Sequence, residues 1–331
     1  MGEAMGQRAW MVERPGGEFR PVESPPPELK GNYVLVRIAA SGVNPIDTKI
    51  RTGNAKHARQ PLPAVLGLDM AGTVEAVGPG VTAFRPGDEV YGMVGGVGGL
   101  QGTLAEFIAA DADLLARKPA NLSMREAAAL PLSTITAWEG LVDRAKVGAD
   151  HKVLIHAGAG GVGHIAIQVA RAFGAGVFAT VSADKKNVVE GAGATAIDYR
   201  FGSMDEYVAT YTSGKGFDII FDTVGGATLD ASFSGVKRYT GHVVSILGWG
   251  THSLAPLSFR GATYSGVFTL LPLITGENRQ HHGKILAHAA SLVEAGKLKP
   301  LLGDHRFSVA DIAAAYDAVE RGSLGKVVVE L

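Results

Sequence analysis

The sequence predicts an α/β protein in which a doubly wound parallel sheet is inserted into a separate β-rich domain. Residues 126–269 alternate short apolar runs with helical patterns, which is typical of a parallel sheet with helical crossovers. Residues 5–125 contain short strand-like runs and turns instead. Residues 270–331 end in "GKVVVEL", an apolar stretch that we expect to pair back with the N-terminal strands. One domain is therefore expected over 5–125 plus 270–331, and a second over 126–269.

The β-rich region is identified by strand-like runs that end at Gly and Pro. We expect strands in "YVLVRIAASGVN" (33–44), in "AGTVEAVGPGV" (71–81) and in "PGDEVYGMV" (86–94). The stretch "ESPPPELKG" (23–31) is an extended connection between strands.

In the middle region, each expected strand is a short, nearly continuous apolar run, as in a sheet covered on both faces. Helices are expected around 203–212 and 226–235. The first expected helix has an apolar face made by Val162, Ile165, Ala166, Val169, Ala170 and Phe173. The expected strands are "KVLIHA", "GVFATV", "TAIDY", "FDIIFDTV", "HVVSIL" and "TYSGVFTL".

The last region is expected to add two helices and a short strand before the final one. The helices are "HGKILAHAASLVEAGKL" (282–298) and "ADIAAAYDAVERG" (310–322), and the strand between them is "HRFSV" (305–309).

Composition excludes several functional classes. The formal charge is −1 and no block of basic residues occurs, which argues against nucleic acid or a membrane surface as a partner. The absence of cysteine excludes disulfides, a cysteine nucleophile and thiolate metal sites. No signal-peptide pattern or apolar run of membrane-spanning length is present, so a cytoplasmic protein is expected. No G-x-S-x-G sequence occurs, which argues against a hydrolase of that type.

Gly158, Gly160 and Gly163 form the pattern G-x-G-x-x-G between an expected strand and an expected helix. The glycines allow a tight turn, close approach of the backbone to a pyrophosphate, and close helix–strand packing. The helix N-terminus favours the phosphate charge. In this context the motif predicts a Rossmann-type dinucleotide site, and the alternative is a purely structural turn.

The end of the second strand in this region favours NADPH over NADH. An NAD site usually has an Asp or Glu there, which binds the ribose hydroxyls. Here the strand ends at Ser182, and Asp184 comes later, beside Lys185 and Lys186. A hydroxyl and an ammonium group suit a 2′-phosphate. The alternative is that these lysines are ordinary solvated side chains.

The stretch "DHKVLIHAGAGGVGHIAIQVAR" (150–171) resembles the signature of the quinone oxidoreductase and ζ-crystallin family, a zinc-free branch of the medium-chain dehydrogenases/reductases. The similarity extends over essentially the whole chain, including "SGVNPIDTKIRTG" (41–53) and "PLSTITAWEGL" (131–141). It implies a GroES-like catalytic domain built from both ends of the chain, an inserted Rossmann NADP-binding domain, and an active cleft between them.

The resemblance also implies roles for individual residues. Ser182, Lys186 and Tyr199 would surround the 2′-phosphate, and Ala159, Gly160, Gly161 and Val162 would hold the pyrophosphate. Gly225 and the segment Ile246, Leu247, Gly248 and Trp249 would line the nicotinamide side, with Asn44 and Thr136 near the nicotinamide end.

Zinc is not expected. Zinc-dependent relatives have Gly-His-Glu where this chain has Gly67-Leu68-Asp69, and the ten histidines show no metal-binding spacing. Without a Lewis acid, the expected acceptor is a quinone or another conjugated carbonyl, which delocalises the charge of a transferred hydride. Asn44 is the candidate donor to the developing oxyanion, and Asp47 the candidate that orients it. Both residues could instead cap the turn around Pro45.

These observations predict an NADPH-dependent quinone reductase. The alternatives are an enone, enal or enoyl-thioester reductase on the same fold, and a non-catalytic, crystallin-like NADPH-binding protein. Lys49 stands where close family members often have tyrosine, so its role stays open. The resemblance and the apolar last strand of the middle region predict a homodimer.

Overall fold

The computed structural model describes residues 6–331, which form two compact units. The first contains the residues up to Leu132 together with Leu270–Gly296 and Pro300–Leu331; the second contains Ser133–Thr269 and Lys297–Lys299. Residue 5, where the first predicted domain starts, and the first residues considered for a signal peptide lie outside the described residues.

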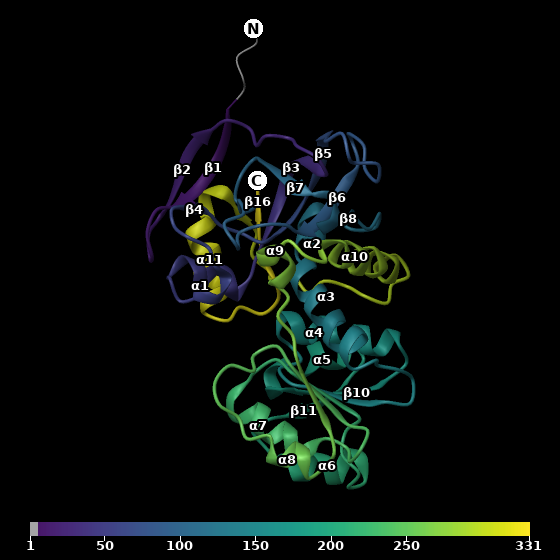
Figure 1. Cartoon of the computed structure of the whole chain (residues 1–331). Helices are drawn as coiled ribbons and strands as arrows, with labels where there is room; N and C mark the ends of the chain where they lie inside the picture. The colour runs from purple at the N-terminus through teal and green to yellow at the C-terminus, as the bar shows by residue number, and fades with distance from the viewer. Residues whose placement is uncertain (1–5) are drawn as a thin grey trace. The chain divides into compact units, whose positions relative to one another are not determined.

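The first unit is built on two sheets (Figure 1). The smaller has the strand order β2-β1-β4, and the larger has the order β15-β16-β3-β5-β6-β8, with β7 also pairing with β3. The strands are β1 (Gln7–Val12), β2 (Phe19–Ser24), β3 (Tyr33–Val43), β4 (Ala64–Val65), β5 (Asp69–Val77), β6 (Glu89–Met93), β7 (Phe107–Asp111), β8 (Leu115–Arg117), β15 (Phe307–Ser308) and β16 (Val327–Glu330).

Several helices accompany these sheets. Among them, α10 and α11 were predicted, and α1 was not, because the sequence around Pro45 was interpreted as a turn. The helices and short helical turns are α1 (Pro45–Arg51), η1 (Lys56–Ala58), η2 (Ala112–Leu114), α2 (Met124–Ala128), α9 (Leu271–Thr275), α10 (Arg279–Glu294), η5 (Val309–Asp311) and α11 (Ile312–Glu320). Helix α3 (Pro131–Trp138) begins in the first unit and ends in the second.

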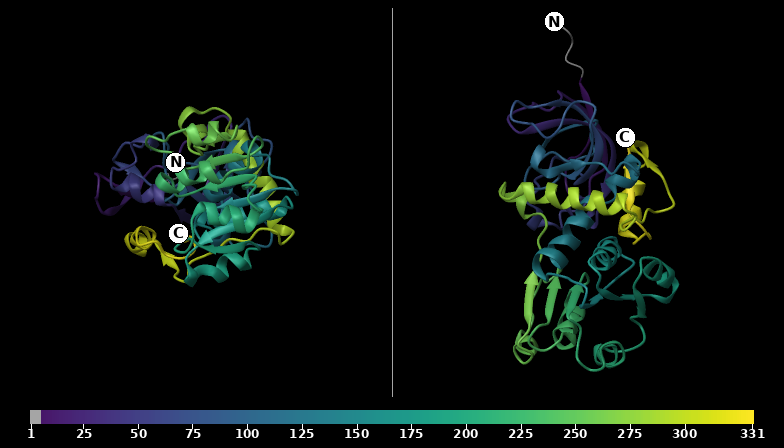
Figure 2. Two further views of the ribbon diagram at one scale, coloured as in Figure 1. Left: turned by 90° about the horizontal axis from the view of Figure 1, so that it is seen from below. Right: turned by 90° about the vertical axis from the view of Figure 1, so that its right-hand side faces the viewer.

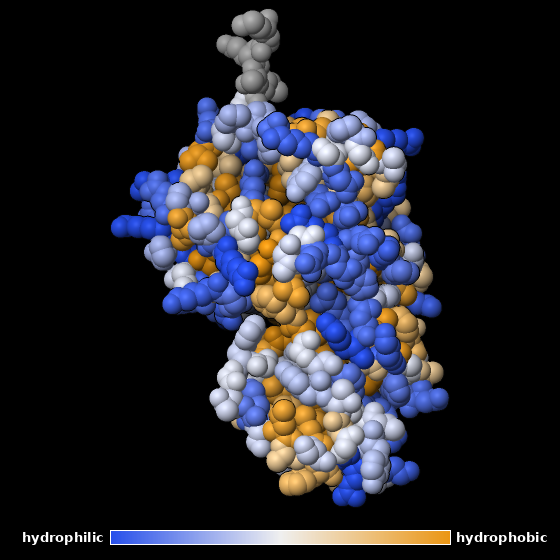
Figure 3. Space-filling model, in the orientation of Figure 1, coloured by the Kyte–Doolittle hydropathy of each residue, from blue (hydrophilic) through white to orange (hydrophobic). Residues whose placement is uncertain are grey.

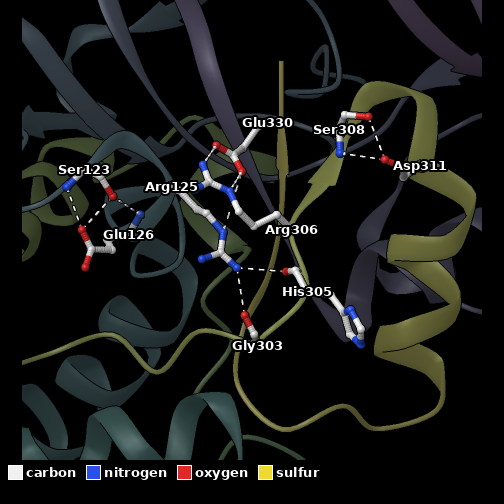
Figure 4. Close-up of polar contacts among 9 residues, drawn as sticks. All are labelled: Ser123, Arg125, Glu126, Gly303, His305, Arg306, Ser308, Asp311 and Glu330. Atoms are coloured by element: carbon white, nitrogen blue, oxygen red, sulfur yellow. Dashed lines mark hydrogen bonds and ion pairs between the residues drawn. The ribbon is translucent and has the colours of Figure 1, made fainter.

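The C-terminal segment completes the larger sheet. Strand β16 pairs antiparallel with β3, as the alternation in "GKVVVEL" predicted. Arg125 fixes the approach to this strand by donating to the carbonyl groups of Gly303 and His305 at 2.8 and 3.0 Å, and Arg306 pairs with Glu330 (Figure 4). A segment far along the chain is therefore an integral part of the N-terminal unit.

The second unit is a doubly wound parallel sheet with the strand order β11-β10-β9-β12-β13-β14. Numbered from β9, this order reads 3-2-1-4-5-6, the dinucleotide-binding arrangement that reverses direction between β9 and β12. All the predicted strands are present: β9 (Lys152–Ile155), β10 (Gly176–Val181), β11 (Thr195–Asp198), β12 (Ile219–Asp222), β13 (His242–Ser245) and β14 (Thr263–Gly266). Figure 2 shows strands of this sheet side by side.

Helices cover the sheet of the second unit. Side chains from alternate strand positions, such as Leu154, Ile220 and Val243, pack with Phe233 and other residues of α6 to α8 in one apolar core. Burial of such side chains is the main stabilising term. The helical elements are η3 (Glu139–Arg144), α4 (Gly161–Ala172), η4 (Ala183–Lys185), α5 (Lys186–Gly191), α6 (Met204–Thr212), α7 (Gly226–Gly235) and α8 (Ala255–Ser258).

The apolar face predicted for α4 needs one correction. Ile165, Ala166, Val169 and Ala170 are buried and Val162 is half-buried, but Phe173 follows the helix and is 37 % exposed, with its ring edge-on to Trp138. Phe173 lies outside the core because α4 ends before it.

No helix within residues 6–331 has the length and apolar character needed to cross a bilayer.

Candidate functional site

The glycine-rich turn joins β9 to α4, as its spacing predicted. A Cβ atom at Gly158 would lie 2.7 Å from the Cβ of Ala179, and one at Gly163 would collide with the carbonyl oxygen of Ala157. These two glycines permit close packing of the turn, strand and helix. Gly160 and Gly161 are exposed, and a Cβ at either would approach no atom closer than 3.2 Å. The outer side of the turn is therefore open bare backbone, which suits a pyrophosphate.

The side chains of Thr180 and His156 stabilise this turn through hydrogen bonds. The Thr180 hydroxyl accepts from the backbone N–H of Ala157 at 3.1 Å and lies 3.2 Å from Nδ1 of His156. Burial lowers the pKa of His156 to about 4, so the ring is neutral at physiological pH. His156 contacts the Ser232 hydroxyl through its other nitrogen, at 3.2 Å. The turn is thus held by an uncharged network, and the sequence motif gave no indication of it.

Asp222, at the carboxyl end of β12, shapes the neighbouring loop. Its carboxylate accepts from the backbone N–H groups of Val224 and Gly225 at 3.0–3.1 Å and from the Ser245 hydroxyl at 2.6 Å. Gly225 has φ of +78°, and a Cβ there would lie 2.5 Å from the carbonyl oxygen of Leu247. This aspartate was not identified from sequence, although its position at a strand end in this fold is a signal for a binding edge.

The residues predicted to contact a 2′-phosphate lie near the ends of β10 and β11. Val181 and Asp198 are register partners, so Ser182 and Tyr199 follow two adjacent strand ends. Tyr199 is 59 % exposed. Lys186 begins α5 and pairs with Glu190 at 3.4 Å, with both side chains half exposed.

Besides Lys186, two charged side chains, Asp184 and Arg200, determine the charge at this end of the sheet. A hydrogen bond from the Ser182 side chain lowers the pKa of Asp184. The Asp184 side chain is therefore a negative charge beside the predicted phosphate position. Arg200, which the sequence interpretation missed, makes a two-pronged contact with Asp198 at 3.1 and 2.8 Å. Its guanidinium adds a second cation to Lys186, and guanidinium groups match phosphate geometry.

The other predicted cofactor residues are also placed. Thr136 is buried in α3 and its hydroxyl lies 2.9 Å from that of Thr269. Ile246 to Trp249 follow β13, and the backbone N–H of Leu247 donates to Ser245 at 3.1 Å. Trp249 is half exposed, with its ring edge-on to Phe268.

In the first unit, Asn44 lies at the centre of a buried polar cluster. It precedes α1 and its Nδ2 donates to Oδ2 of Asp69 at 3.0 Å. The Lys326 ammonium donates to Oδ1 of Asn44 and to the same Asp69 oxygen, the latter at 3.1 Å. The other Asp69 oxygen accepts from the backbone N–H of Leu132 at 3.0 Å. Asn44, Asp69 and Lys326 are all buried.

The donors and acceptors of this cluster fix the orientation of the Asn44 amide. An ammonium group can only donate, and an ionised carboxylate can only accept. Oδ1 of Asn44 must therefore face Lys326, and Nδ2 must face Asp69. One of the two N–H groups on Nδ2 is used by Asp69, which leaves the second as a donor of fixed direction.

Asp47 is a second buried polar residue near Asn44. Its Oδ2 accepts from the backbone N–H of Asn44 at 2.8 Å, which confirms part of the capping interpretation. Its Oδ1 and the hydroxyl of Tyr316 are buried without a hydrogen-bond partner among residues 6–331. Burial raises the pKa of Asp47 to about 7 against the effect of the Asn44 hydrogen bond. Burial and the Asp47 charge raise the pKa of the Tyr316 hydroxyl.

The raised pKa of Asp47 predicts a pH dependence of stability. The folded pKa of about 7 exceeds the unfolded value of 3.8, so the folded state holds the proton more tightly, and the group's stabilisation is lost as pH rises toward 7. In Asp47→Asn this loss is absent. From pH 5.5 to 8.5, the free energy of unfolding should fall about 2 kcal/mol more in the wild type than in the variant. Urea unfolding at both pH values measures this, and parallel changes in the two proteins would contradict the assignment.

Leu68, at the position where zinc-dependent relatives have histidine, is a fully buried apolar side chain. Within residues 6–331, no group of three or more His, Cys, Asp and Glu side chains is arranged to hold a metal ion.

Two sequence families match the chain. Residues 30–120 match the family described as alcohol dehydrogenase GroES-like domain, and residues 191–329 match the family described as zinc-binding dehydrogenase.

Curated relatives align over nearly the whole chain. A 2-methylene-furan-3-one reductase of Solanum lycopersicum is 36 % identical over 92 % of this chain and 73 % of its own length. A chloroplastic NADPH-dependent alkenal/one oxidoreductase of Arabidopsis thaliana is 35 % identical over 97 % of this chain and 79 % of its own. A quinone oxidoreductase of Homo sapiens is 30 % identical over 90 % of this chain and 88 % of its own.

Solved structures have the same fold. An alcohol dehydrogenase superfamily protein from Novosphingobium aromaticivorans is 55 % identical, with a TM-score of 0.96 over 98 % of this chain and 99 % of that one. The quinone oxidoreductase from Coxiella burnetii is 28 % identical, with a TM-score of 0.82 over 99 % of this chain and 100 % of that one.

Proposed function

Because this chain belongs to the medium-chain dehydrogenase/reductase superfamily and is an NAD(P)H-dependent oxidoreductase, we propose that it reduces conjugated carbonyl compounds, quinones among them, with NADPH and without zinc. The observation that carries this proposal is the buried cluster around Asn44. It provides an uncharged hydrogen-bond donor of fixed direction, and its acceptor Asp69 directly follows Leu68, which stands where zinc-dependent relatives have histidine.

The residues of the second unit fit a dinucleotide. The open backbone from Ala159 to Val162 would hold the pyrophosphate, and the loop shaped by Asp222 would carry the nicotinamide side. Lys186 and Arg200 would hold a 2′-phosphate. When bound, NADPH supplies the hydride.

Asn44 would stabilise the charge that develops on the acceptor oxygen. Its second N–H has no partner in the cluster, and Lys326 and Asp69 prevent the amide from turning its oxygen toward the substrate. A preorganised donor in a buried environment stabilises an oxyanion more strongly than water does. An acceptor whose carbonyl is conjugated needs no stronger electrophile than this.

The reaction also consumes a proton, and Asp47 is our candidate to hold it. With a pKa of about 7, its carboxyl group carries a proton in a substantial fraction of molecules at neutral pH. Oδ1 of Asp47 is the oxygen without a partner, so we assign the proton to that atom. The backbone hydrogen bond between Asp47 and Asn44 places this carboxyl group directly beside the proposed oxyanion donor.

Enones and enals are a second candidate class of acceptor. Two relatives whose names specify such substrates, the furanone reductase and the alkenal/one oxidoreductase, are 36 % and 35 % identical, against 30 % for the human quinone oxidoreductase. Both classes place charge on a conjugated oxygen, so the same Asn44 donor serves either.

The direct test measures NADPH oxidation with a quinone and with an alkenal, and NADP⁺ reduction with a simple alcohol. We expect 1,4-benzoquinone or an alkenal to be reduced, and the rates to be unchanged after treatment with a chelator. The quinone-to-alkenal ratio of kcat/KM then identifies the preferred class. Rapid oxidation of ethanol or propanol with NADP⁺, or loss of activity with the chelator, would contradict the proposal. Tight NADPH binding without turnover of any acceptor would favour the non-catalytic alternative.

Lys186 is expected to contribute to a preference for NADPH. Lys186→Ala should weaken NADPH binding roughly tenfold, because it removes a charge-assisted contact that solvent partly screens. NADH lacks the phosphate, so its Kd should not change. Fluorescence titration with both cofactors measures this, with Lys185→Ala as the matched control. An equal loss for NADH and NADPH would show that Lys186 is structural, and a wild-type preference for NADH would refute the cofactor assignment.

We also propose a homodimer formed through β14. This strand is at the edge of the six-stranded sheet, where its outer hydrogen-bonding groups can pair with a second copy. Light scattering should give about twice the 34.3 kDa chain mass at micromolar concentration. A mass of one chain would contradict this prediction.

A further inference from the structure

A cavity of about 500 Å³ lies beside the C-terminal end of α1 in the first unit. Its walls come from the last turn of that helix and from the loop that follows, including the η1 turn. The lining residues are Ile50, Gly53, Ala55, Lys56, Arg59, Gln60 and Pro61. The lining combines apolar groups with two cations and contains no carboxylate.

The segment around this cavity is strongly basic in a chain of formal charge −1. Residues 49–60 include four Lys or Arg side chains and no Asp or Glu. Arg51 is engaged with Asp317 at 3.8 Å and with the Phe19 ring. Figure 3 shows hydrophilic residues at the margin of the first unit where α1 lies.

The other three cations of the segment, Lys49, Lys56 and Arg59, are exposed. Within residues 6–331, none of them has a carboxylate within ion-pair distance. Burial and the charge of Lys49 lower the pKa of His57, which places the Lys49 ammonium in the electrostatic environment of the same loop. The cavity is therefore a site of uncompensated positive charge.

The loop is held firmly in this shape. Gln60 accepts from the backbone N–H of Gly99 at 2.9 Å and donates to the carbonyl group of Leu100 at 3.3 Å. Gly98 donates to the carbonyl group of Ala58 at 2.9 Å. Arg59 has φ of +50°, a left-handed conformation that is costly for a non-glycine residue. These contacts anchor the backbone that carries the cations, so the ordering that a ligand must still impose is confined to the exposed Lys56 and Arg59 side chains.

We propose that this cavity is a subsite for an anionic group on the acceptor, so that the preferred substrate is a conjugated carbonyl compound bearing a carboxylate or phosphate. The inference rests on the proposed function, because α1 connects the cavity to Asn44. The helix has seven residues and is about 10 Å long. An acceptor with its carbonyl at Asn44 therefore needs an extended chain of several atoms between that carbonyl and its anionic group.

The test compares two acceptors that differ only in charge, a benzoquinone with a carboxyalkyl side chain and its methyl ester. In the wild type, kcat/KM should be higher for the acid than for the ester. In Lys56→Gln/Arg59→Gln, the acid-to-ester ratio should fall roughly tenfold, because two solvent-screened charge contacts are removed. The wild-type ratio should also decrease as salt is raised.

A matched control removes two exposed cations elsewhere in the same unit. Arg20 and Lys30 have side-chain exposures of 63 % and 70 %, and Arg20→Gln/Lys30→Gln should leave the acid-to-ester ratio at the wild-type value. A wild-type ratio near one, or a ratio that falls equally in both double variants, would overturn the proposal.

Failure of this proposal and failure of the proposed function are distinguished by calorimetry. Binding of the acid and of the ester to the NADP⁺-loaded protein is measured without turnover. Tighter binding of the acid, lost in Lys56→Gln/Arg59→Gln, would support the subsite even if no acceptor were reduced. Equal affinity for acid and ester would refute it even if both were reduced.

A second pair of acceptors identifies the source of the anion. Crotonyl coenzyme A carries phosphates, and the N-acetylcysteamine thioester of crotonate does not. A phosphate-bearing carrier is the source if the coenzyme A thioester is preferred and this preference is lost in Lys56→Gln/Arg59→Gln. A carboxylate on the acceptor itself is the source if only the quinone acid shows the effect.

Discussion

Replacing Asn44 with alanine is expected to lower kcat by roughly 100- to 1000-fold, because it removes the preorganised donor to the developing oxyanion. The Kd for NADPH should not change, since the proposed pyrophosphate and 2′-phosphate contacts come from other residues. Steady-state kinetics with a quinone and with an alkenal, together with fluorescence titration of NADPH, measure both quantities.

Two further variants show whether the donor itself is responsible. Asn44→Asp keeps the size of the side chain but removes its N–H groups, so kcat should fall as far as in Asn44→Ala. Thr48→Ala removes another buried polar side chain, whose hydroxyl donates to the carbonyl group of Pro45, and should keep wild-type kcat. A loss confined to NADPH affinity would instead make Asn44 a cofactor contact.

Replacing Lys326 with methionine is expected to have two effects. It leaves the Asp69 carboxylate buried without its counter-ion, which should cost about 3–5 kcal/mol of stability. It also removes the group that faces Oδ1 of Asn44, so the amide can rotate and kcat should fall roughly 10- to 100-fold. Urea unfolding and steady-state kinetics separate these effects.

A charge-neutral double variant distinguishes a positioning role from a purely structural one. Lys326→Met/Asp69→Asn removes both charges and should recover most of the stability, since no unpaired charge remains. It should not recover kcat, because no cation then fixes the Asn44 amide. Lys326→Arg keeps the charge and should retain more activity than Lys326→Met. Recovery of kcat in the double variant would assign Lys326 to folding alone.

Much of the fold could be predicted because its signals are local. Apolar runs located every strand of the parallel sheet, and the glycine spacing located the turn before α4. The alternation in "GKVVVEL" predicted that a late strand would join the N-terminal sheet, and β16 does pair with β3. Helix α1 was missed, because Asn44 and Pro45 are equally typical of a turn and of the start of a helix.

The candidate site could be predicted only in part, because its essential partners are distant in sequence. Asn44 was identified from its motif, but Lys326, its partner, is 282 residues away and was noticed only as part of a strand. In the sequence, Asp69 was considered only because it stands in place of the glutamate of the Gly-His-Glu triplet of zinc-dependent relatives. Its role as the acceptor of the Asn44 amide follows from the hydrogen bond in the structure. Arg200 was missed because it follows a short strand that has no binding motif of its own.

The sequence separation between Lys326 and Asp69 has a consequence for biosynthesis. The two residues of this ion pair are 257 positions apart, and the whole of Ser133–Thr269 is translated between them. On the ribosome, the second unit is therefore available to fold while the first still lacks its lysine and its strand β16. During this interval Asp69 cannot be buried with its counter-ion, so the first unit cannot complete its ion pair or its larger sheet until Lys326 and β16 have been synthesised.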